Sequence, residues 1–395
     1  MRKAAIVGIA EFPERRVQDD ISALNIKASS AQRALEDAGL GWGDVDALYD
    51  AGEAFSGMSP VMMAEYLQVN PRVIDGTAVG GSSYEFHAAH ARRDIEAGRA
   101  RVALLTYGST AKRDRRAIGT GGRMTQGMPT PSGNIEDPWG LTLIANYALV
   151  ARRHMHQYGT RPEDLAEIAV VTRRHAMRNP QAVKAMQDLG FRDVGNLSVR
   201  DVLHSPMISD PLHLLDCCMI SDGGGAVVIA SDEVARETRH RPVWILGSGE
   251  AVGYPDNKRD ITVTAAARSG PEAFGQAGVR PEEIDVAMIY DSFTITVLAS
   301  LEDLGFCAKG EGGAYVANGR LAFDIPGGPA LNTDGGGLSS NHPGMRGIFL
   351  LIEAARQLRG ESSAQVAEAR LAVVHGNGGQ LGTRHAGATV ILGRD

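Results

Sequence analysis

The sequence predicts an α/β protein made of two similar halves. Short apolar runs alternate with amphipathic stretches along most of the chain, a pattern typical of α/β layers. A short repeat supports the two halves: residues 34–46 and 273–285 both read Ala-x3-Ala-Gly, then an apolar residue, four further residues, and Val or Ile followed by Asp. In each copy we expect the glycine to end a helix and an apolar strand to follow after a short loop.

Apolar runs bounded by glycine or polar residues are the expected strands. They lie, in order, at residues 4–8, 47–49, 102–107, 226–230, 243–247, 286–290, 371–374 and 388–392. Helices are expected where apolar residues recur with a period near 3.6, as in the stretches that end at the two repeat glycines. A polar run at residues 232–242 marks the seam, so we place the first half at residues 1–235 and the second at residues 240–395.

Residues 109–205 interrupt this alternation. They are richer in Arg, Met, Pro and Gly, with helices expected near residues 141–157 and 161–178. We expect an inserted loop domain that lies over the first half, because long insertions in such folds are usually functional. The insertion begins with the basic run 112–116, which is either a phosphate-binding segment or, as is commoner for such runs, a solvated charged loop.

Composition excludes several classes of function. The formal charge of −7 argues against a general nucleic-acid or anionic-membrane binder. No apolar run is long enough to span a bilayer, and the chain enters its first expected strand directly after Met1, so we expect no leader peptide. Cys217, Cys218 and Cys307 are too few for a disulfide framework and lack zinc-site spacing. We therefore expect a cytoplasmic protein.

The segment from Thr77 to Tyr84 (Thr-Ala-Val-Gly-Gly-Ser-Ser-Tyr) leads into an expected helix that ends near residue 97. A turn before a helix N-terminus can present a nucleophile, because the unpaired N–H groups stabilise a thiolate. Here the apex is Gly81, which has no side chain. Ser82 is one residue further on, which turns its side chain by roughly 100° on a helix. A serine nucleophile also needs a base, and helix capping is the commoner role of serine at such a position.

Four later blocks occur in order. They are Ser205-Pro-Met-Ile-Ser-Asp-Pro through Asp222-Gly-Gly-Gly-Ala226, Tyr290-Asp-Ser-Phe293, Leu331-Asn-Thr-Asp-Gly-Gly-Gly through Asn341-His-Pro-Gly344, and His375-Gly-Asn-Gly-Gly-Gln380. With the apex at Gly81, these blocks resemble the thiolase superfamily, and within it the sterol-carrier-protein (SCP-x) and lipid-transfer-protein branch. The resemblance implies a thiolase fold: two αβα halves that form a five-layer αβαβα core with an inserted loop domain.

The resemblance also implies the site residues. The family's nucleophilic cysteine falls on Gly81, its Gly-His-Pro histidine on His342, its second cysteine on His375, and the Asn of its Asn-Glu block on Tyr290. Implied as catalytic are His342, His375 and Tyr290, and as substrate-binding Gly81, Ser82, Asp291, Asn341 and Gly378. Four of these residues have a plainer alternative from the residues alone: His342 as a packed histidine, His375 as a strand-end histidine, Tyr290 at the edge of a core, and Asp291 as the cap of the helix after it.

The implied ligand is an acyl-CoA thioester, with coenzyme A as part of the substrate and no further cofactor or metal. Because the nucleophile is missing, we expect an enzyme that makes or breaks a carbon–carbon bond through an enolate rather than an acyl-cysteine. Thiolase-like aldolases use a tyrosine that matches Tyr290 and a second one that falls here on Ser340. The alternatives are an inactive acyl-CoA- or lipid-binding protein and a serine acyltransferase. A homodimer and a small OB-fold and zinc-ribbon partner subunit are also implied.

Overall fold

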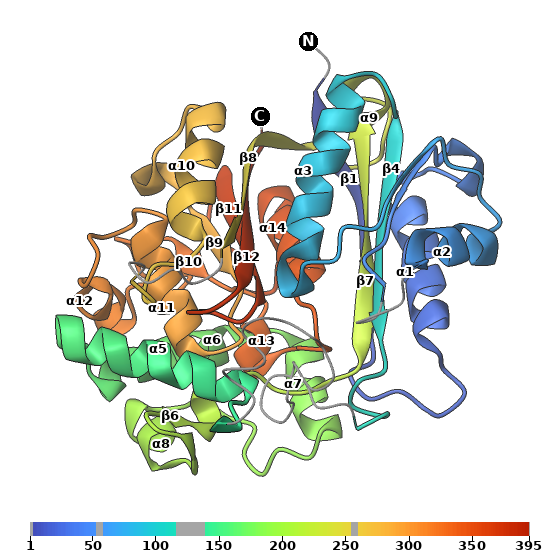
Figure 1. The fold of residues 1–395 in the computed structure, drawn as a ribbon. Helices are drawn as coiled ribbons and strands as arrows, with labels where there is room; N and C mark the ends of the chain where they lie inside the picture. The colour runs from blue at the N-terminus through green and yellow to red at the C-terminus, as the bar shows by residue number, and fades with distance from the viewer. Residues whose placement is uncertain (1–2, 53–57, 116–138, 254–259, 395) are drawn as a thin grey trace.

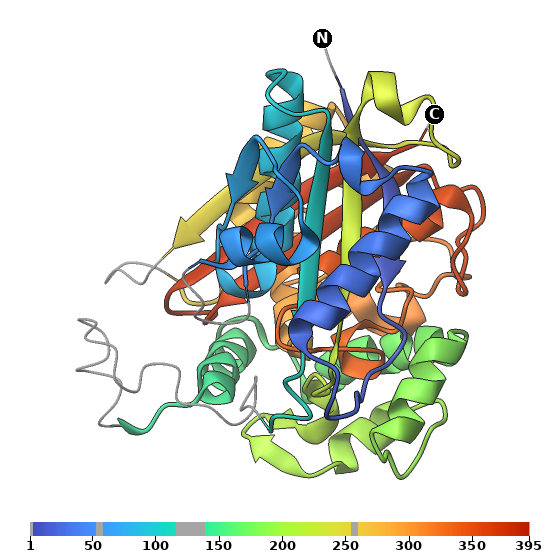
Figure 2. The same cartoon turned by 90° about the vertical axis from the view of Figure 1, so that its right-hand side faces the viewer.

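The computed structural model describes residues 3–52, 58–115, 139–253 and 260–394. Ten strands form one mixed sheet: β1 (Ala4–Glu11), β2 (Ala47–Tyr49), β3 (Val73–Asp75), β4 (Val102–Ser109), β7 (Gly223–Ser231), β8 (Val243–Gly253), β9 (Val286–Ile289), β10 (Ala330–Leu331), β11 (Leu371–Gly379) and β12 (His385–Gly393). Their order in the sheet is β10-β9-β11-β12-β8-β1-β7-β4-β2-β3. The first strand of each half, β1 in the first and β8 in the second, therefore lies at the centre of the sheet, and the two are neighbours (Figures 1 and 2).

Both halves of the sheet have the same topology. Counted outward from the centre, the first half runs β1-β7-β4-β2-β3 and the second runs β8-β12-β11-β9-β10. In each half the first two neighbours pair antiparallel and the last two pair parallel. The halves join where Ala5 pairs with Trp244 and Ile6 pairs with Val243. The two-fold repeat predicted from the sequence is thus a repeat of the fold.

Helices divide the molecule into five layers (Figure 1). The helices of the layers are α1 (Ala23–Ala38), α3 (Ser83–Glu96), α10 (Ala266–Ala277), α11 (Thr294–Asp303) and α14 (Gly347–Arg359). Helices α3 and α14 lie between the two halves of the sheet, α1 covers the outer face of the first half, and α10 with α11 covers the outer face of the second. The central layer buries a large apolar cluster to which both halves contribute. This arrangement confirms the predicted five-layer core.

Matching glycines let the outer helices approach the sheet. A Cβ built on Gly8 would overlap the carbonyl oxygen of Ala34 in α1, and one built on Gly247 would overlap that of Ala273 in α10. Ala34 and Ala273 are equivalent positions of the sequence repeat. Both helices then end at the predicted glycine, Gly39 or Gly278, in the left-handed conformation.

The insertion follows β4 and holds most of the remaining elements. They are α5 (Leu143–Tyr158), α6 (Pro162–Ala176), α7 (Pro180–Asp188) and α8 (Val199–His204), and the short strands β5 (Met207–Ser209) and β6 (Leu212–His213) follow directly after it. The two predicted helices of the insertion are confirmed as α5 and α6. The expected position over the first half is wrong for them, because their apolar faces share one cluster with α10, α11 and the outer face of the second half.

The other helices are short: α2 (Ser59–Leu67), α9 (Asp232–Ala235), α12 (Gly312–Val316) and α13 (Gly336–Ser339). All the predicted strands are present, whereas the edge strands β3 and β10 of the large sheet and the separate pair β5 and β6 were not predicted. Each of these strands has only two or three residues, too few for a periodic pattern. Among the described residues, none of the helices combines the length and apolar character needed to cross a membrane. The placement of the half boundaries at residues 235 and 240 stays a prediction.

Candidate active site

The glycine apex of the first half lies against the last residues of β11 from the second half. A short 3-10 turn (Gly80–Ser82) precedes α3. A Cβ on Gly80 would lie 2.9 Å from the backbone nitrogen of Gly379, and one on Gly378 would overlap the carbonyl oxygen of Val79. Gly80 also has a φ of 76°, which favours glycine. The glycines at positions 80 and 378 therefore let two backbones from opposite halves meet.

The ring of Tyr290 covers the apex. Tyr290 follows β9 directly, and its side chain belongs to the central apolar cluster. A Cβ built on Gly81 would overlap ring atoms Cε2 and Cζ of Tyr290, and would lie 2.5 Å from the backbone oxygen of Asn377. The space that a side chain at position 81 would need is thus already occupied.

Tyr290 and His342 form a hydrogen-bonded pair. The phenol oxygen lies 3.0 Å from His342 Nε2, and the rings meet edge to face with centroids 5.6 Å apart. The backbone N–H of Arg346 donates to the same phenol oxygen at 3.3 Å, and the Gly344 carbonyl lies 3.4 Å from it. Each of the two side chains is only 3% exposed.

Burial keeps both members of this pair uncharged. It raises the pKa of the Tyr290 phenol well above its usual value. Burial, with the nearby charge of Arg346, lowers the pKa of His342 to about 3. The phenol has two acceptors within reach, and Nε2 at 3.0 Å is nearer than the Gly344 carbonyl at 3.4 Å. We therefore assign the phenol proton to the bond with Nε2, which leaves the imidazole proton on Nδ1. Nδ1 is buried and has no hydrogen-bond partner among the described residues.

The backbone of His342 is anchored by Ser221. The His342 N–H donates to Ser221 Oγ at 3.0 Å, and the Ser221 N–H donates to the His342 carbonyl at 3.3 Å. Ser221 belongs to the long sequence block that ends at Ala226. That block therefore contributes to the site by holding the backbone that carries the histidine.

Asp291 fastens the glycine-rich segment before His342. It accepts backbone N–H bonds from Gly337 at 2.8 Å and Leu338 at 3.2 Å, at the start of α13, and forms an ion pair with Arg346 at 3.2 Å. Burial raises its pKa to about 6, although Arg346 acts in the opposite direction. The alternative that Asp291 caps the helix after it is wrong, since α11 begins after Phe293 without a side-chain cap.

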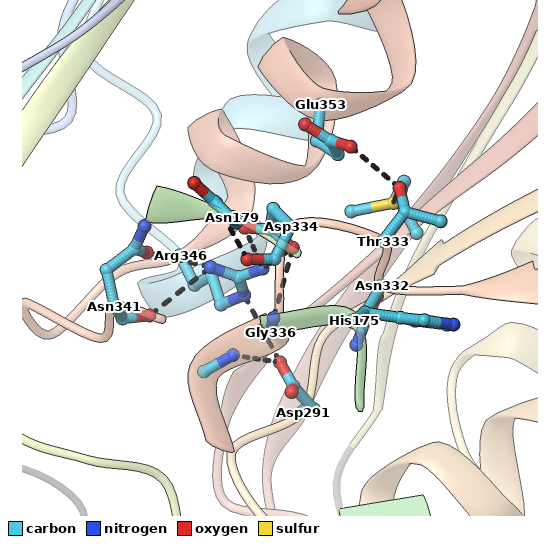
Figure 3. Close-up of polar contacts among 12 residues, drawn as sticks. His175, Asn179, Asp291, Asn332, Thr333, Asp334, Gly336, Asn341, Arg346 and Glu353 are labelled. Carbon is cyan, nitrogen blue, oxygen red and sulfur yellow. Dashed lines mark hydrogen bonds and ion pairs between the residues drawn. The ribbon is translucent and has the colours of Figure 1, made fainter. Parts of the chain in front are cut away.

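Asn341 is also engaged by the protein. Its Oδ1 accepts from Arg346 at 2.7 Å, and its Nδ2 donates to Glu11 at 2.9 Å. Asp291 and Asn341, both implied as substrate-binding by the resemblance, thus lie in a buried polar network that surrounds Arg346 (Figure 3).

The structure does not bring His375 to the Tyr290–His342 pair. Side chains alternate along β11, and Val374 faces the central layer with Tyr290. His375 faces the opposite way: its Nδ1 lies 2.9 Å from Thr389 Oγ1, which in turn bonds Ser269 of α10 at 2.8 Å. Burial lowers the pKa of His375 to about 3. Its position is that of a packed histidine in the outer layer.

The apex serines bond to nearby backbone. Ser82 Oγ lies 3.5 Å from the Val79 carbonyl and 3.4 Å from that of Ala386. Ser83 Oγ donates to the Gly80 carbonyl at 2.7 Å and accepts from the Val79 N–H. Within the described residues neither hydroxyl has a histidine among its hydrogen-bond partners, so this geometry offers no base for a serine nucleophile.

The cysteines and the basic run add no reactive group here. Burial raises the pKa of Cys217 and of Cys307 to about 12 and that of Cys218 well above its usual value, as for structural thiols. The Arg113 guanidinium contacts backbone carbonyls of residues 18–21, and Arg116 lies outside the described residues. Where the structure describes the chain, no group of three or more His, Cys, Asp or Glu side chains is arranged to hold a metal ion.

Sequence reasoning missed two buried ionisable residues beside the site. Arg346 follows the His-Pro block, and its charge within a run of glycine and apolar residues is a signal that could have been used. Glu85 lies one helical turn after the apex, and its carboxyl oxygens have no hydrogen-bond partner among the described residues. A Cβ on Gly347 or on Gly376 would overlap this carboxyl group. Burial raises the pKa of Glu85 well above its usual value, which keeps the group protonated.

Known proteins of one superfamily are similar to this chain. A family model described as "Thiolase C-terminal domain-like" matches residues 247–394. The "Steroid side-chain-cleaving aldolase" of Thermomonospora curvata is 34% identical over 99% of this chain and 98% of its own. The "Acetyl-CoA acetyltransferase" of Methanothermobacter thermautotrophicus is 32% identical, over 97% of this chain and 98% of that protein. A solved structure of the "Ltp2-ChsH2(DUF35) aldolase" superposes with a TM-score of 0.85 at 31% identity, covering 100% of this chain and 98% of that chain.

Proposed function

Because this chain belongs to the thiolase superfamily, as a member of its sterol-carrier-protein-like branch, we propose that it makes or breaks a carbon–carbon bond beside the thioester of an acyl-CoA without a covalent acyl-enzyme. The observation that carries this proposal is the Tyr290–His342 pair, which lies directly over the glycine where the family's nucleophile would stand. A phenol and an imidazole at 3.0 Å move protons, whereas acyl transfer through position 81 has neither a sulfur nor the room for one.

In the cleavage direction the pair acts as a proton relay. The β-hydroxyl proton of the substrate passes to the Tyr290 oxygen while the phenol proton passes to His342 Nε2. The Cα–Cβ bond then breaks to give a carbonyl compound and a thioester enolate. Neither protein group carries charge at rest, so charge develops on the imidazole only as it develops on the enolate.

His342 also serves the enolate. Once Nε2 has accepted the proton, Nδ1–H belongs to an imidazolium, and it is a buried donor with no protein partner among the described residues. We assign it to the enolate oxygen, where a donor that strengthens during the reaction lowers the barrier most. The proton on Nε2 returns through Tyr290 to the enolate carbon, which releases the shortened acyl-CoA and restores both groups.

This assignment leaves Asp291, Asn341 and His375 outside the chemistry. Asp291 and Asn341 hold the loop that carries His342, and His375 faces the outer helices. Gly81 and Gly378 act by leaving room: the first for the phenol ring and the second for the turn that carries the apex.

We also propose a small partner subunit of OB-fold and zinc-ribbon type, on a homodimer of this chain. The support is the similar aldolase, which is named with a DUF35 partner. Co-expression with a DUF35-type protein from the same genome, followed by size-exclusion chromatography with light scattering, tests both statements. A chain that elutes as a monomer and retains no partner would contradict them.

The competing function is an acyl-CoA- or lipid-binding protein without catalysis, favoured by Ser340 at the place of the second aldolase tyrosine. Solvent exchange separates the two without knowledge of the true substrate. The wild-type protein is incubated with butyryl-CoA in D2O, and deuterium at Cα is measured by mass spectrometry. An enzyme that forms enolates incorporates deuterium above the buffer control. Tight binding of several acyl-CoAs without exchange into any of them would favour the binding protein.

A further inference from the structure

We propose that Arg346 is the positioning residue of this site: one guanidinium and its backbone N–H hold Tyr290 and His342 at reacting distance. This inference rests on the proposed function, because it concerns the pair to which that function is assigned. Arg346 touches no reacting atom through its side chain, so its role differs from that of the pair itself.

The guanidinium reaches three separate segments of the chain (Figure 3). One terminal nitrogen lies 2.7 Å from each carboxylate oxygen of Asp334. The other donates to Asn341, to its Oδ1 at 2.7 Å and to its backbone oxygen at 3.2 Å. Nε forms the 3.2 Å ion pair with Asp291. The arginine is fully buried.

Two of these three partners are chain neighbours of the two reacting residues. Asp291 directly follows Tyr290, and Asn341 directly precedes His342. Arg346 therefore joins the backbone on one side of the pair to the backbone on the other. Its own N–H bonds the phenol oxygen at 3.3 Å, so the same residue also sets the direction in which the phenol proton points.

Asp334 connects Arg346 to the glycine-rich segment at the start of α13. Its Oδ1 accepts the N–H of Gly336 at 3.0 Å, and its carbonyl accepts from Asn179 of the insertion at 3.0 Å. Asp291 holds the next two N–H groups of that segment. Two carboxylates thus fix the start of α13, and Arg346 fixes both carboxylates.

Only arginine fits this arrangement. A guanidinium presents five donors in one rigid plane, which suits partners on several sides, whereas a lysine ammonium is a single point charge. Two carboxylates, Asp334 and Asp291, raise the pKa of Arg346 against the effect of burial, so the group stays charged. That charge also helps to keep His342 neutral and able to accept at Nε2. Glu11, which bonds Asn341, is the further carboxylate facing this cluster.

The test compares two arginines of the same helical segment. Arg346→Lys keeps the positive charge and loses the planar set of guanidinium N–H donors. Arg359→Lys is the matched control, because the Arg359 side chain is only 2% exposed, lies at the other end of α14 and forms its ion pair with Asp37 rather than with the residues around Tyr290 and His342. Asn341→Ala is the milder second variant: it removes one partner and leaves both carboxylates on Arg346. Exchange of butyryl-CoA in D2O, thermal unfolding, and histidine carbon-13 NMR are measured for each.

We expect Arg346→Lys to slow exchange by about 100-fold, since misplacement of reacting groups by about 1 Å costs that much, while the apparent KM for butyryl-CoA stays close to that of wild type. Asn341→Ala should slow it less, and Arg359→Lys should exchange at the wild-type rate. The NMR signals of His342, assigned with His342→Gln, should move in Arg346→Lys and Asn341→Ala and stay in place in Arg359→Lys.

The inference is overturned if a folded Arg346→Lys variant exchanges deuterium at the wild-type rate and its His342 NMR signals do not shift. If Arg346→Lys does not fold, an unshifted His342 in Asn341→Ala overturns it instead. If the wild-type protein exchanges no acyl-CoA, the proposed function fails, and the shift of the His342 signals still decides whether Arg346 holds this residue.

Discussion

The phenol ring of Tyr290 fills the space that any side chain at Gly81 would occupy. A side chain therefore cannot be added at position 81 unless the Tyr290 ring moves. Position 81 is closed by an aromatic ring on one side and by the backbone carbonyl of Asn377 on another. In the proposed function, the chemistry rests on two residues of the second half of the chain, Tyr290 and His342, which meet above the apex.

Adding a side chain at the apex should damage the site without restoring acyl transfer. We expect Gly81→Ala to lower the free energy of unfolding by roughly 1–3 kcal/mol, as overpacked cores do, and to abolish exchange by displacing Tyr290. Gly81→Cys should give no acyl adduct with butyryl-CoA by intact-protein mass spectrometry. The control is Gly275→Ala in α10, where a new Cβ meets nothing within 4 Å. A stable Gly81→Cys that acquires an acyl group would refute this account of the apex.

Removal of the imidazole should slow catalysis strongly and leave the fold intact. His342→Ala should reduce the exchange rate by about 10²–10³, the effect of losing one oxyanion donor. The free energy of unfolding, measured with urea, should change little, because the backbone hydrogen bonds between His342 and Ser221 remain. Loss of cooperative folding together with loss of exchange would assign His342 a structural role instead.

His375 should matter for stability at acid pH and little for catalysis. Its pKa is about 3 in the folded protein because of burial, below the usual value for histidine. As the pH falls from 6.5 toward 3, the unfolded chain binds a proton at this position that the folded chain does not, so stability is present at neutral pH and lost in this window. His375→Asn should remove on the order of 2 kcal/mol of the loss between pH 7 and pH 5.

The measurement for His375 is urea unfolding at both pH values, with exchange activity measured in parallel. Because the side chain contacts Thr389 in the outer layer, we expect His375→Asn to retain exchange. An inactive but well-folded His375→Asn would return His375 to the catalytic set that the sequence motifs imply.

Glu85 should have the opposite pH dependence. Burial raises its pKa, so above about pH 4.5 the unfolded chain releases a proton that the folded chain keeps, and stability falls as the pH rises through this range. Glu85→Gln keeps the shape and removes the titration. We expect it to be more stable than wild type at pH 8 and similar at pH 4.5, with exposed Glu65→Gln as the control. A Glu85→Gln less stable than wild type at pH 8 would show that the carboxylate is ionised and paired.

The fold was predictable because its signals are local. The glycine caps Gly39 and Gly278 and the apolar strands that follow them record the two halves. The first residues of the repeat, Ala34 and Ala273, have carbonyls that pack against Gly8 and Gly247 of the preceding strands. The short edge strands and the packing of α5 and α6 on the second half left no such signal, since both depend on contacts between segments far apart in the sequence.

The site was predictable only in part, because it too depends on contacts between segments that are far apart in the sequence. Motifs located Gly81, Tyr290 and His342, but the direction of a side chain decides what it does. His375 is on the strand beside Tyr290 and faces the other way, and Asp291 caps α13 rather than the helix that follows it. Arg346 has no motif role of its own, and its importance follows from a set of partners that only the folded chain assembles.

Exchange by Tyr290→Phe tests the central claim most directly. The variant keeps the ring that fills the apex and removes only the hydroxyl that bonds His342. Tyr49→Phe is the control, a buried tyrosine whose hydroxyl bonds Asp94 away from the site. Deuterium incorporation at Cα of butyryl-CoA should be present in wild type and Tyr49→Phe and should fall by about 10²–10⁴ in Tyr290→Phe, the range for one acid–base group. A folded Tyr290→Phe variant that exchanges deuterium at the wild-type rate would contradict the proposed role of the Tyr290 hydroxyl.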